Sequence, residues 1–355
     1  MEVGIIGLPA SGKTTLFATL TGQDAQPGFS GKVEVHRGVV QVPDARLDRL
    51  TDIFNPRKKV PATIQYIEVG GMDSDSKGFD AQFLQVLKNT AVLCVLIRAF
   101  DSETYPHPLG SVDPQRDIAM VDSEFLLSDM AIVEGRIERL EKQVKKAKDE
   151  ALEKELALMK HCYGFLEQEI PLREAGLSPD EKRILRGYQF LTLKPLVLVL
   201  NLAEEDIAKE AEILAKIPQR PSVTSVALCA RAEQEISQLA EEDRNLFLEE
   251  LGISEPAANK LIRASYELLG LISFFTVGED ECRAWNVQNG AMAPEAAGVI
   301  HSDLERGFIR AEVVHYDDFM AAGSLSAARD KGKLRLEGKT YPVKDGDILN
   351  IRFNV

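Results

Sequence analysis

Residues 7–14 have the residue types and spacing with the clearest chemical meaning in this sequence. They read Gly-Leu-Pro-Ala-Ser-Gly-Lys-Thr, which fits the Gly-x-x-x-x-Gly-Lys-Thr phosphate-binding pattern. The glycines let main-chain N–H groups turn toward phosphate oxygens, and the start of the following helix adds partial positive charge. Lys13 can then reach the β- and γ-phosphates and neutralise charge during catalysis, while the Thr14 hydroxyl binds Mg²⁺. The residues expected at the phosphates are Gly7, Ala10, Ser11, Gly12, Lys13, Thr14 and Thr15.

A carboxylate at the end of a neighbouring strand is the second part of such a site, because it helps to hold Mg²⁺. Glu68 follows the apolar run 64–67 and stands where GTPase-like switches have the Asp of Asp-x-x-Gly. Because Glu is one methylene longer, the metal geometry must shift or act through water. We expect Thr14 and Glu68 to be the metal-binding residues. A charged strand end without a metal role is the alternative for Glu68.

Base recognition requires polar residues just beyond later strands. The run Asn201-Leu202-Ala203-Glu204 stands where GTPases have Asn-Lys-x-Asp. Asn201 can brace the loop, but Leu202 replaces Lys, and Glu204 replaces the Asp that reads guanine. This weakens a guanine site and favours adenine. Cys229 and Ala230 occupy the last loop expected to contact the base.

The elements that must position these residues are those of an α/β domain. Short apolar runs at 3–6, 39–42, 64–69, 92–97, 195–200 and 222–228 predict buried strands, and 15–20 begins a helix. At 355 residues, the chain predicts roughly two or three domains. From residue 273 onward, short β-like runs separated by Gly, Asp and Lys turns predict a small mixed domain.

Between the two sets of strands, apolar residues recur at spacings of three and four, typical of a coiled-coil seam. The two series are out of phase, which favours an antiparallel helical hairpin with its tip near 146–151 over one long helix. The seams are Met130, Val133, Ile137, Leu140, Val144 and Ala147, then Leu152, Leu156, Met159, Tyr163, Leu166 and Ile170. We therefore expect a P-loop domain at 1–121 and 191–270, an inserted hairpin at 122–190, and a C-terminal domain at 271–355.

Composition restricts the class of protein. The net charge of −14 argues against nonspecific coating of nucleic acid. A basic cluster at Lys142, Lys145, Lys146 and Lys148 suggests a local binding surface, with a solvated helix face as the alternative. The four scattered cysteines indicate reduced structural thiols, and the apolar runs are too short to span a bilayer. We expect a cytoplasmic protein without a signal peptide, membrane contact or sequence-specific nucleic acid.

Matching stretches run nearly from end to end between this chain and the YchF/Obg-like ATPase family, which it resembles. They lie at 4–9, 42–47, 190–195, 201–204, 250–252, 283–285, 293–301, 305–312, 336–339 and 343–347. The resemblance implies a G-domain, a coiled-coil arm and a C-terminal TGS-type, ubiquitin-like domain. It also implies ATP and Mg²⁺ as ligands. The implied partner is the ribosome, as the large subunit or the 70S particle, in translation control or stress responses.

Several residues depart from the family pattern. Ala10 stands where the family has an Asn that in related enzymes helps to bind potassium, so potassium dependence is in doubt. Lys32 aligns with the Thr that closes on Mg²⁺, and Glu68 replaces Asp. Met72 occupies the place of the water-orienting Gln, as in this family, and His107 matches a histidine that the family is thought to use instead. A surface loop histidine is the alternative reading of His107.

Taken together, these patterns predict a slow, Mg²⁺-dependent ATPase that acts as a switch on the translation machinery. The alternative is a module that holds ATP with little or no hydrolysis, which the altered switch residues favour. A phosphotransferase is disfavoured, because no arginines and strand-end carboxylate are arranged for a second substrate.

Overall fold

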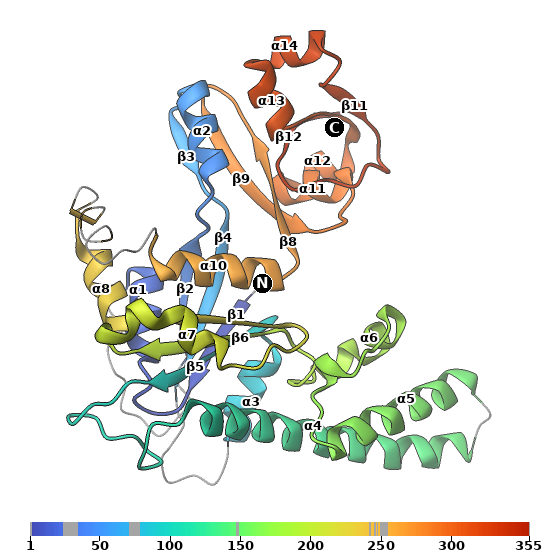
Figure 1. Cartoon of the computed structure of the whole chain (residues 1–355). Coiled ribbons are helices and arrows are strands. Elements are labelled where there is room, and N and C mark those ends of the chain that lie inside the picture. Colours follow the sequence, from blue (N-terminus) through green and yellow to red (C-terminus); the bar gives the residue numbers. More distant parts are fainter. Residues whose placement is uncertain are drawn as a thin grey trace. The chain divides into compact units, whose positions relative to one another are not determined.

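The fold is described from a computed structural model, which covers residues 2–23, 35–70, 79–146, 149–240, 243–244, 246, 248 and 255–354. Lys32 and Met72 therefore lie outside the described residues. The contacts divide the chain into two compact units, 1–38 with 65–261 and 39–64 with 262–355. Figure 1 follows the chain through both units.

The first unit is built around a six-stranded sheet in the order β2-β4-β1-β5-β6-β7, and β2 and β4 run on into the second unit. Five neighbouring strands, β4, β1, β5, β6 and β7, are parallel. The strands are β1 (Glu2–Gly7), β2 (Val35–Gln41), β4 (Thr63–Val69), β5 (Val92–Ala99), β6 (Leu196–Leu202) and β7 (Val223–Leu228). The near-continuous apolar sequences of β5 and β6 agree with burial on both faces of a parallel sheet.

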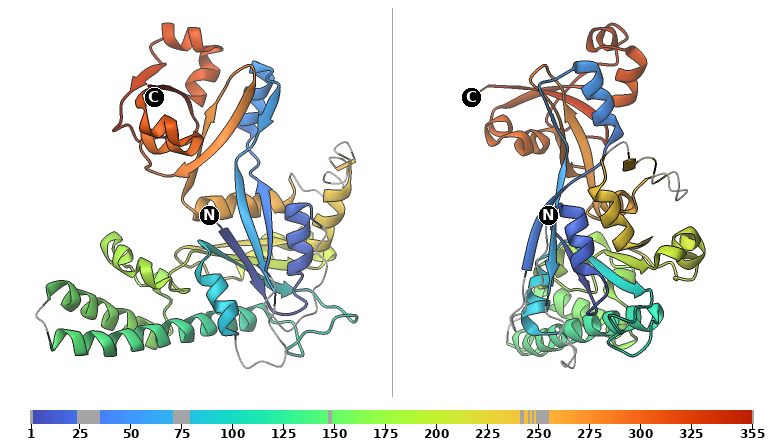
Figure 2. Two further views of the ribbon diagram at one scale, coloured as in Figure 1. Left: turned by 180° about the vertical axis from the view of Figure 1, so that it is seen from behind. Right: turned by 90° about the vertical axis from the view of Figure 1, so that its left-hand side faces the viewer.

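Helices cover both faces of this sheet (Figure 2). One face packs Ile6 and Val95 against Phe83 of α3 and Phe125 of α4. The helices outside the arm are α1 (Lys13–Thr21), α3 (Ala81–Lys88), α6 (Pro179–Leu185), α7 (Glu210–Ala215), α8 (Ala230–Gln238) and α10 (Ala257–Leu268), the last of which runs into the second unit. The 3₁₀ turns are η1 (Leu172–Glu174), η2 (Arg186–Tyr188) and η3 (Glu204–Lys209).

A long helical hairpin, hereafter the arm, is formed by α4 (Pro114–Val144) and α5 (Glu150–Glu167), which lie side by side in Figures 1 and 2. The predicted hairpin is confirmed, with α4 ending at Val144 and α5 beginning at Glu150, although α4 begins at Pro114 rather than near 122. The two predicted seams do face one another: Val133 and Leu140 share one buried cluster with Met159 and Leu166. An Arg136–Glu155 ion pair also joins the two helices, with Nε 2.8 Å from Oε1.

The second unit has a six-stranded sheet in the order β11-β10-β12-β8-β9-β3. Its strands are β3 (Lys58–Val60), β8 (Leu271–Thr276), β9 (Glu281–Gln288), β10 (Phe308–His315), β11 (Arg335–Glu337) and β12 (Asp347–Phe353). Its helices are α2 (Ala45–Phe54), α11 (Ala293–Ile300), α12 (Ser302–Arg306), α13 (Tyr316–Ala322) and α14 (Leu325–Asp330). The predicted β-rich C-terminal part is thus present.

Residues 39–64 join this second unit, whereas the sequence pattern groups them with the P-loop domain. The reason is local packing: β3 pairs in parallel with β9, and Phe54 of α2 stacks on Phe319 of α13 at 5.5 Å. Arg46 also donates to Asp345 at 2.6 Å. The remaining predicted domain boundaries stay a prediction.

Candidate nucleotide site

The carboxyl ends of β1, β4, β5, β6 and β7 meet at one edge of the first sheet, where ligands of open α/β sheets bind. A cleft of about 810 Å³ lies there, within the size range of ligand pockets. Its lining includes Ala10, Gly12, Lys13, Thr14, Thr15, Asn201, Leu202, Glu204, Cys229 and Ala230. Ten of the predicted site residues are therefore brought together by the fold.

The glycines of the phosphate loop are required by close approaches. A Cβ on Gly7 would lie 2.3 Å from the Leu96 carbonyl oxygen. Gly12 has a φ of 95°, and a Cβ there would lie 2.4 Å from Nδ2 of Asn201. Gly12 also caps α1 without a described side-chain partner, so the first N–H groups of this helix remain available to phosphate oxygens.

Ala10 adopts a φ of 57°, a left-handed conformation that Ala rarely takes. The Asn found there in the family tolerates this conformation better. Ala10 is exposed and lines the cleft, so the presence of Ala instead of Asn at this position alters the surface that a ligand would contact.

Lys13 turns back onto the loop, where Nζ donates to the carbonyl oxygens of Gly7 at 3.0 Å and Leu8 at 2.9 Å. Burial of the ammonium group lowers the pKa of Lys13 to about 8, although the Glu68 carboxylate favours the charged form. The ammonium group of Lys13 thus lies beside the phosphate loop and is bonded to two of its main-chain carbonyls.

The two residues predicted to bind metal are in contact. The Thr14 hydroxyl donates to Oε1 of Glu68 at 2.6 Å. Glu68 is buried, and its Oε2 has no hydrogen-bond partner among the described residues, while Nδ1 of His36 lies 3.8 Å from it. A hydroxyl beside a carboxylate with an unsatisfied oxygen is a donor set that suits a hard divalent cation.

Asn201 braces the site from the end of β6. Its Nδ2 donates to the Ser11 carbonyl at 2.8 Å, and its Oδ1 accepts from the Ala230 N–H at 2.9 Å. This buried amide ties the phosphate loop to the start of α8. Ser11 itself is buried beneath the loop rather than lining the cleft.

His107 lies in a different environment from the cleft-lining residues. Its Nε2 donates to Oδ2 of Asp117 at 3.0 Å, and its Nδ1 accepts from the Leu109 N–H at 3.2 Å. Arg116 donates to the other oxygen of Asp117 at 2.8 Å. The His107 ring is therefore fastened to the first turn of α4, and both of its nitrogens are engaged.

Some cleft residues carry no recognisable sequence pattern. Phe100 and Tyr105 come from the loop after β5, and Arg231 and Gln234 from α8. Buried Arg98 supports this loop by donating to the Phe100 carbonyl at 3.0 Å while lying 4.5 Å from the centre of the Phe100 ring. In the sequence, Arg98 could have been recognised as a charged residue near the end of the otherwise apolar strand β5.

Comparison with known proteins agrees with this geometry. The family model YchF-GTPase_C, described as a protein of unknown function, matches residues 271–354. The "Ribosome-binding ATPase YchF" of Bacillus subtilis is 40% identical, over 100% of both chains. The protein of that name from Escherichia coli O157:H7 is 38% identical, over 100% of this chain and 99% of the other.

The chain belongs to the YchF family. The "YchF GTPase" of Schizosaccharomyces pombe has a TM-score of 0.88 at 29% identity, covering 99% of this chain and 97% of the other. A GTP-binding protein of Pyrococcus horikoshii shares the fold, with a TM-score of 0.58 at 19% identity over both full chains. The names of these YchF proteins differ in the nucleotide, ATP for the Bacillus subtilis protein and GTP for the Schizosaccharomyces pombe protein.

Proposed function

We propose that this protein binds ATP with Mg²⁺, hydrolyses it slowly and acts as a nucleotide-controlled switch on the ribosome, in the cytoplasm. The observation that carries the proposal is the cleft where Lys13, Thr14, Asn201 and Ala230 converge. The names of the curated relatives support ATP and the ribosome. In the described part of the chain, no helix is long and apolar enough to cross a bilayer.

Thr14 and Glu68 would hold the Mg²⁺, which neutralises charge on the β- and γ-phosphate oxygens when bound. Their 2.6 Å contact and the unsatisfied Glu68 oxygen support this assignment. The longer Glu side chain places its carboxylate against Thr14 directly, so the Asp-to-Glu departure is compatible with a metal role.

The chain's own contribution to hydrolysis would be positioning and electrostatic stabilisation. The N–H groups at the start of α1 and the Lys13 ammonium group would stabilise the charge that develops on the transferred phosphoryl group. Lys13 must first leave the Gly7 and Leu8 carbonyls. His107 would orient the attacking water by accepting a hydrogen bond from it, which requires Nδ1 to leave the Leu109 N–H.

The position of His107 favours one alternative, a module that holds ATP with little hydrolysis. A histidine with both nitrogens bonded to the protein has no free acceptor for water. A single-turnover assay with excess protein separates the two functions. Conversion of bound ATP to ADP supports the ATPase, and retention of ATP supports the holding module.

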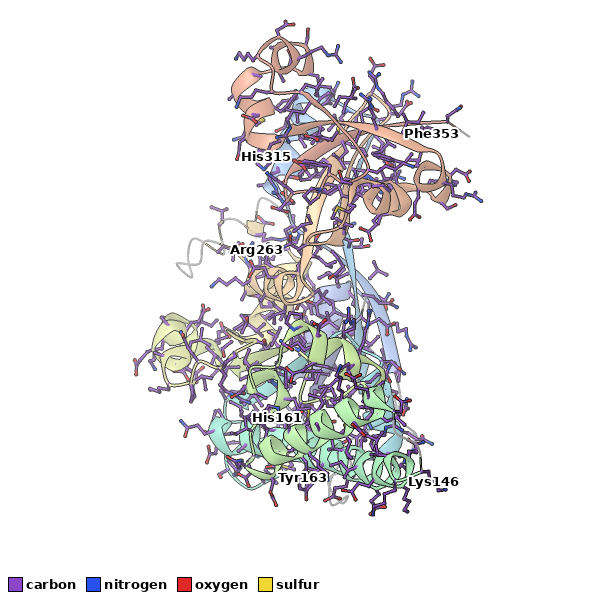
Figure 3. The ribbon with its side chains drawn as sticks, turned by 90° about the vertical axis from the view of Figure 1, so that its right-hand side faces the viewer. Lys146, His161, Tyr163, Arg263, His315 and Phe353 are labelled. Atoms are coloured by element: carbon purple, nitrogen blue, oxygen red, sulfur yellow. The ribbon has the colours of Figure 1, made fainter. Side chains whose placement is uncertain are left out.

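The arm and the C-terminal unit are the proposed partner surfaces. Lys142, Lys145 and Lys146 are exposed near the tip of the arm, and no salt bridge of theirs is present within the described residues. Figure 3 shows the Lys146 side chain at this end of the arm. Free cations on a projecting element suit the phosphates of ribosomal RNA.

The test is a calorimetric titration of ATP and GTP in the presence and absence of Mg²⁺. We expect ATP to bind more tightly and Mg²⁺ to strengthen the binding. Glu68→Gln keeps the side-chain shape but removes the charge, so it should reduce the Mg²⁺-dependent gain by about 10- to 100-fold. Equal or tighter GTP binding, or a Mg²⁺ effect that survives in Glu68→Gln, would contradict the proposal.

A further inference from the structure

The loop that follows β5 lines the cleft as far as Tyr105, and His107 comes two residues later. The His107 side chain is buried. An imidazole that accepts a hydrogen bond from water needs a ring nitrogen without a proton, because a protonated ring nitrogen can only donate. The position of the ring proton therefore decides what His107 can do.

The contacts of the ring identify the nitrogen that carries the proton. The Leu109 N–H donates to Nδ1 of His107 at 3.2 Å, so Nδ1 is the acceptor. The proton of the neutral ring is then on Nε2, which lies 3.0 Å from Oδ2 of Asp117. Because the Asp117 carboxylate is fully buried, water does not compete with this hydrogen bond.

Asp117 is itself held in one orientation by its neighbour Arg116. Nε and Nη2 of Arg116 donate to Oδ1 of Asp117 at 3.0 and 2.8 Å. The same guanidinium donates to the hydroxyl and the main-chain carbonyl of Ser111 at 3.1 and 2.7 Å, which fixes its own position. One carboxylate oxygen is thus bonded to Arg116, and the other is bonded to His107.

We propose that Asp117, oriented by Arg116, is a positioning residue that holds His107 in the tautomer with its acceptor on Nδ1. This inference rests on the proposed function, in which His107 accepts a hydrogen bond from the attacking water. When Nδ1 leaves the Leu109 N–H, the bond from Nε2–H to Asp117 keeps the ring proton on Nε2. Nδ1 therefore remains an acceptor when the water arrives.

Asp117→Asn tests this inference, because the amide has nearly the same shape but presents a donor on one side. The two N–H groups of Arg116 would hold the amide oxygen and turn the NH₂ group toward Nε2 of His107. Nε2 must then accept, the ring proton moves to Nδ1, and Nδ1 can no longer accept from water.

Asp113→Asn is the matched control, the same substitution one turn earlier in the chain. Asp113 caps α4 by accepting from the Arg116 N–H at 3.1 Å, and Asn caps a helix about as well as Asp. This variant should therefore keep both the fold of the loop and the tautomer of His107.

The nitrogen resonances of the His107 ring in ¹⁵N-labelled protein report the tautomer directly, since protonated and unprotonated ring nitrogens resonate in separate ranges. We expect the proton on Nε2 in the wild type and in Asp113→Asn, and on Nδ1 in Asp117→Asn. A wild-type ring that carries a proton on Nδ1 would overturn the inference without recourse to any variant. The same tautomer in Asp117→Asn as in the wild type would also overturn it.

Single-turnover hydrolysis provides the second measurement. Asp117→Asn should be about 10²-fold slower than the wild type, as expected for His107→Ala, with ATP affinity unchanged. The double variant should be no slower than His107→Ala, because Asp117 acts only through the His107 ring.

The turnover rates also separate the two levels of the proposal. A further loss in the double variant, or a loss in His107→Ala without one in Asp117→Asn, would overturn the positioning role alone. If the wild type and His107→Ala hydrolyse ATP equally fast, the proposed role of His107 fails, and the positioning role of Asp117 fails with it.

Discussion

At the scale of single residues, the cleft contains a cation whose charge depends on pH near neutrality. Lys13 has a pKa of about 8 in the nucleotide-free protein, because its ammonium group is buried beneath the phosphate loop. A bound triphosphate favours the charged form and raises this pKa again. The contribution of Lys13 to affinity is therefore fully present well below pH 8 and declines as the pH rises through 8, where binding requires uptake of a proton.

We predict that ATP affinity falls by about tenfold between pH 7.5 and pH 9, as the free ammonium group with a pKa near 8 loses its proton. The measurement is ATP titration at constant Mg²⁺ across this range, in which the triphosphate itself stays ionised. Lys13→Arg is the control, because a guanidinium keeps its charge throughout. A wild-type affinity independent of pH would contradict the assignment of Lys13 to the phosphates.

His107 leads to a second prediction at this scale. If it acts on the water in the transition state, His107→Ala lowers kcat and kcat/KM together and leaves ATP affinity unchanged. We expect turnover about 10²-fold slower, in the range of a general base or water-orienting group. The midpoint temperature of thermal unfolding should also be lower in the variant, because buried Asp117 loses the hydrogen bond that it makes with His107 at 3.0 Å.

His161→Ala is a suitable control, since His161 lies on α5 against Phe165 at 4.7 Å and away from the cleft. Turnover should be unchanged in this variant. If His107→Ala hydrolyses ATP as fast as the wild type, the catalytic assignment is wrong and Lys32, outside the described residues, is the next to test.

At the scale of elements, the arm is anchored to the strand that braces the nucleotide site. Asp129 of α4 is buried and accepts from the N–H groups of Leu191 and Thr192 at 3.0 and 2.7 Å, just before β6. Asn201, which ties the phosphate loop to α8, stands at the other end of β6. The arm is thus joined to the site through one short strand.

We predict that charge reversal of Lys142, Lys145 and Lys146 weakens cosedimentation with ribosomes. Removing contacts to phosphates also reduces the dependence of binding on salt. Reversal of Lys182, Arg183 and Arg186, three exposed cations on α6 and η2 outside the two helices of the arm, is the control. Unchanged cosedimentation of the arm variant at low salt would count against the arm as a ribosome-binding element.

At the scale of the whole molecule, residues 39–64 leave the nucleotide-binding unit and complete the C-terminal one. Arg46 is the main polar link in this packing. It donates to Asp44 at 2.8 Å and Asp345 at 2.6 Å, and its guanidinium lies 5.2 Å from the centre of the Phe275 ring. Asp345 in turn accepts from the Ser273 N–H at 2.9 Å.

Arg46→Ala should therefore lower the free energy of unfolding of this unit by about 2 kcal/mol, as hydrogen bonds to charged groups are lost. Denaturant unfolding followed by circular dichroism measures the change. Arg57→Ala is the control, because its pairing with Asp280 is exposed to solvent at both side chains and should contribute almost nothing. ATP affinity should stay constant in both variants. If the free energy of unfolding falls no more in Arg46→Ala than in Arg57→Ala, the contacts of Arg46 do not stabilise this unit.

Much of the site was predictable because its residues act through local chain geometry. The phosphate loop needs glycines and a Lys-Thr pair in consecutive positions, and the arm needs two apolar seams at regular spacing. Glu68 and Asn201 were predictable because each stands at the end of a buried strand. Parallel strands bring such ends to one edge.

The phosphate loop, the strands around it, the arm and the β-rich C-terminal part could be predicted because they follow from a short motif or from short-range periodicity. No local pattern shows which unit residues 39–64 join, because the pairing of β3 with β9 spans more than 200 residues along the chain. The tertiary structure also shows that Asn201 joins the phosphate loop to α8 and that His107 is bonded to Asp117. Hydrogen-bond partners depend on which side chains meet in space, and residue types along the chain do not specify that.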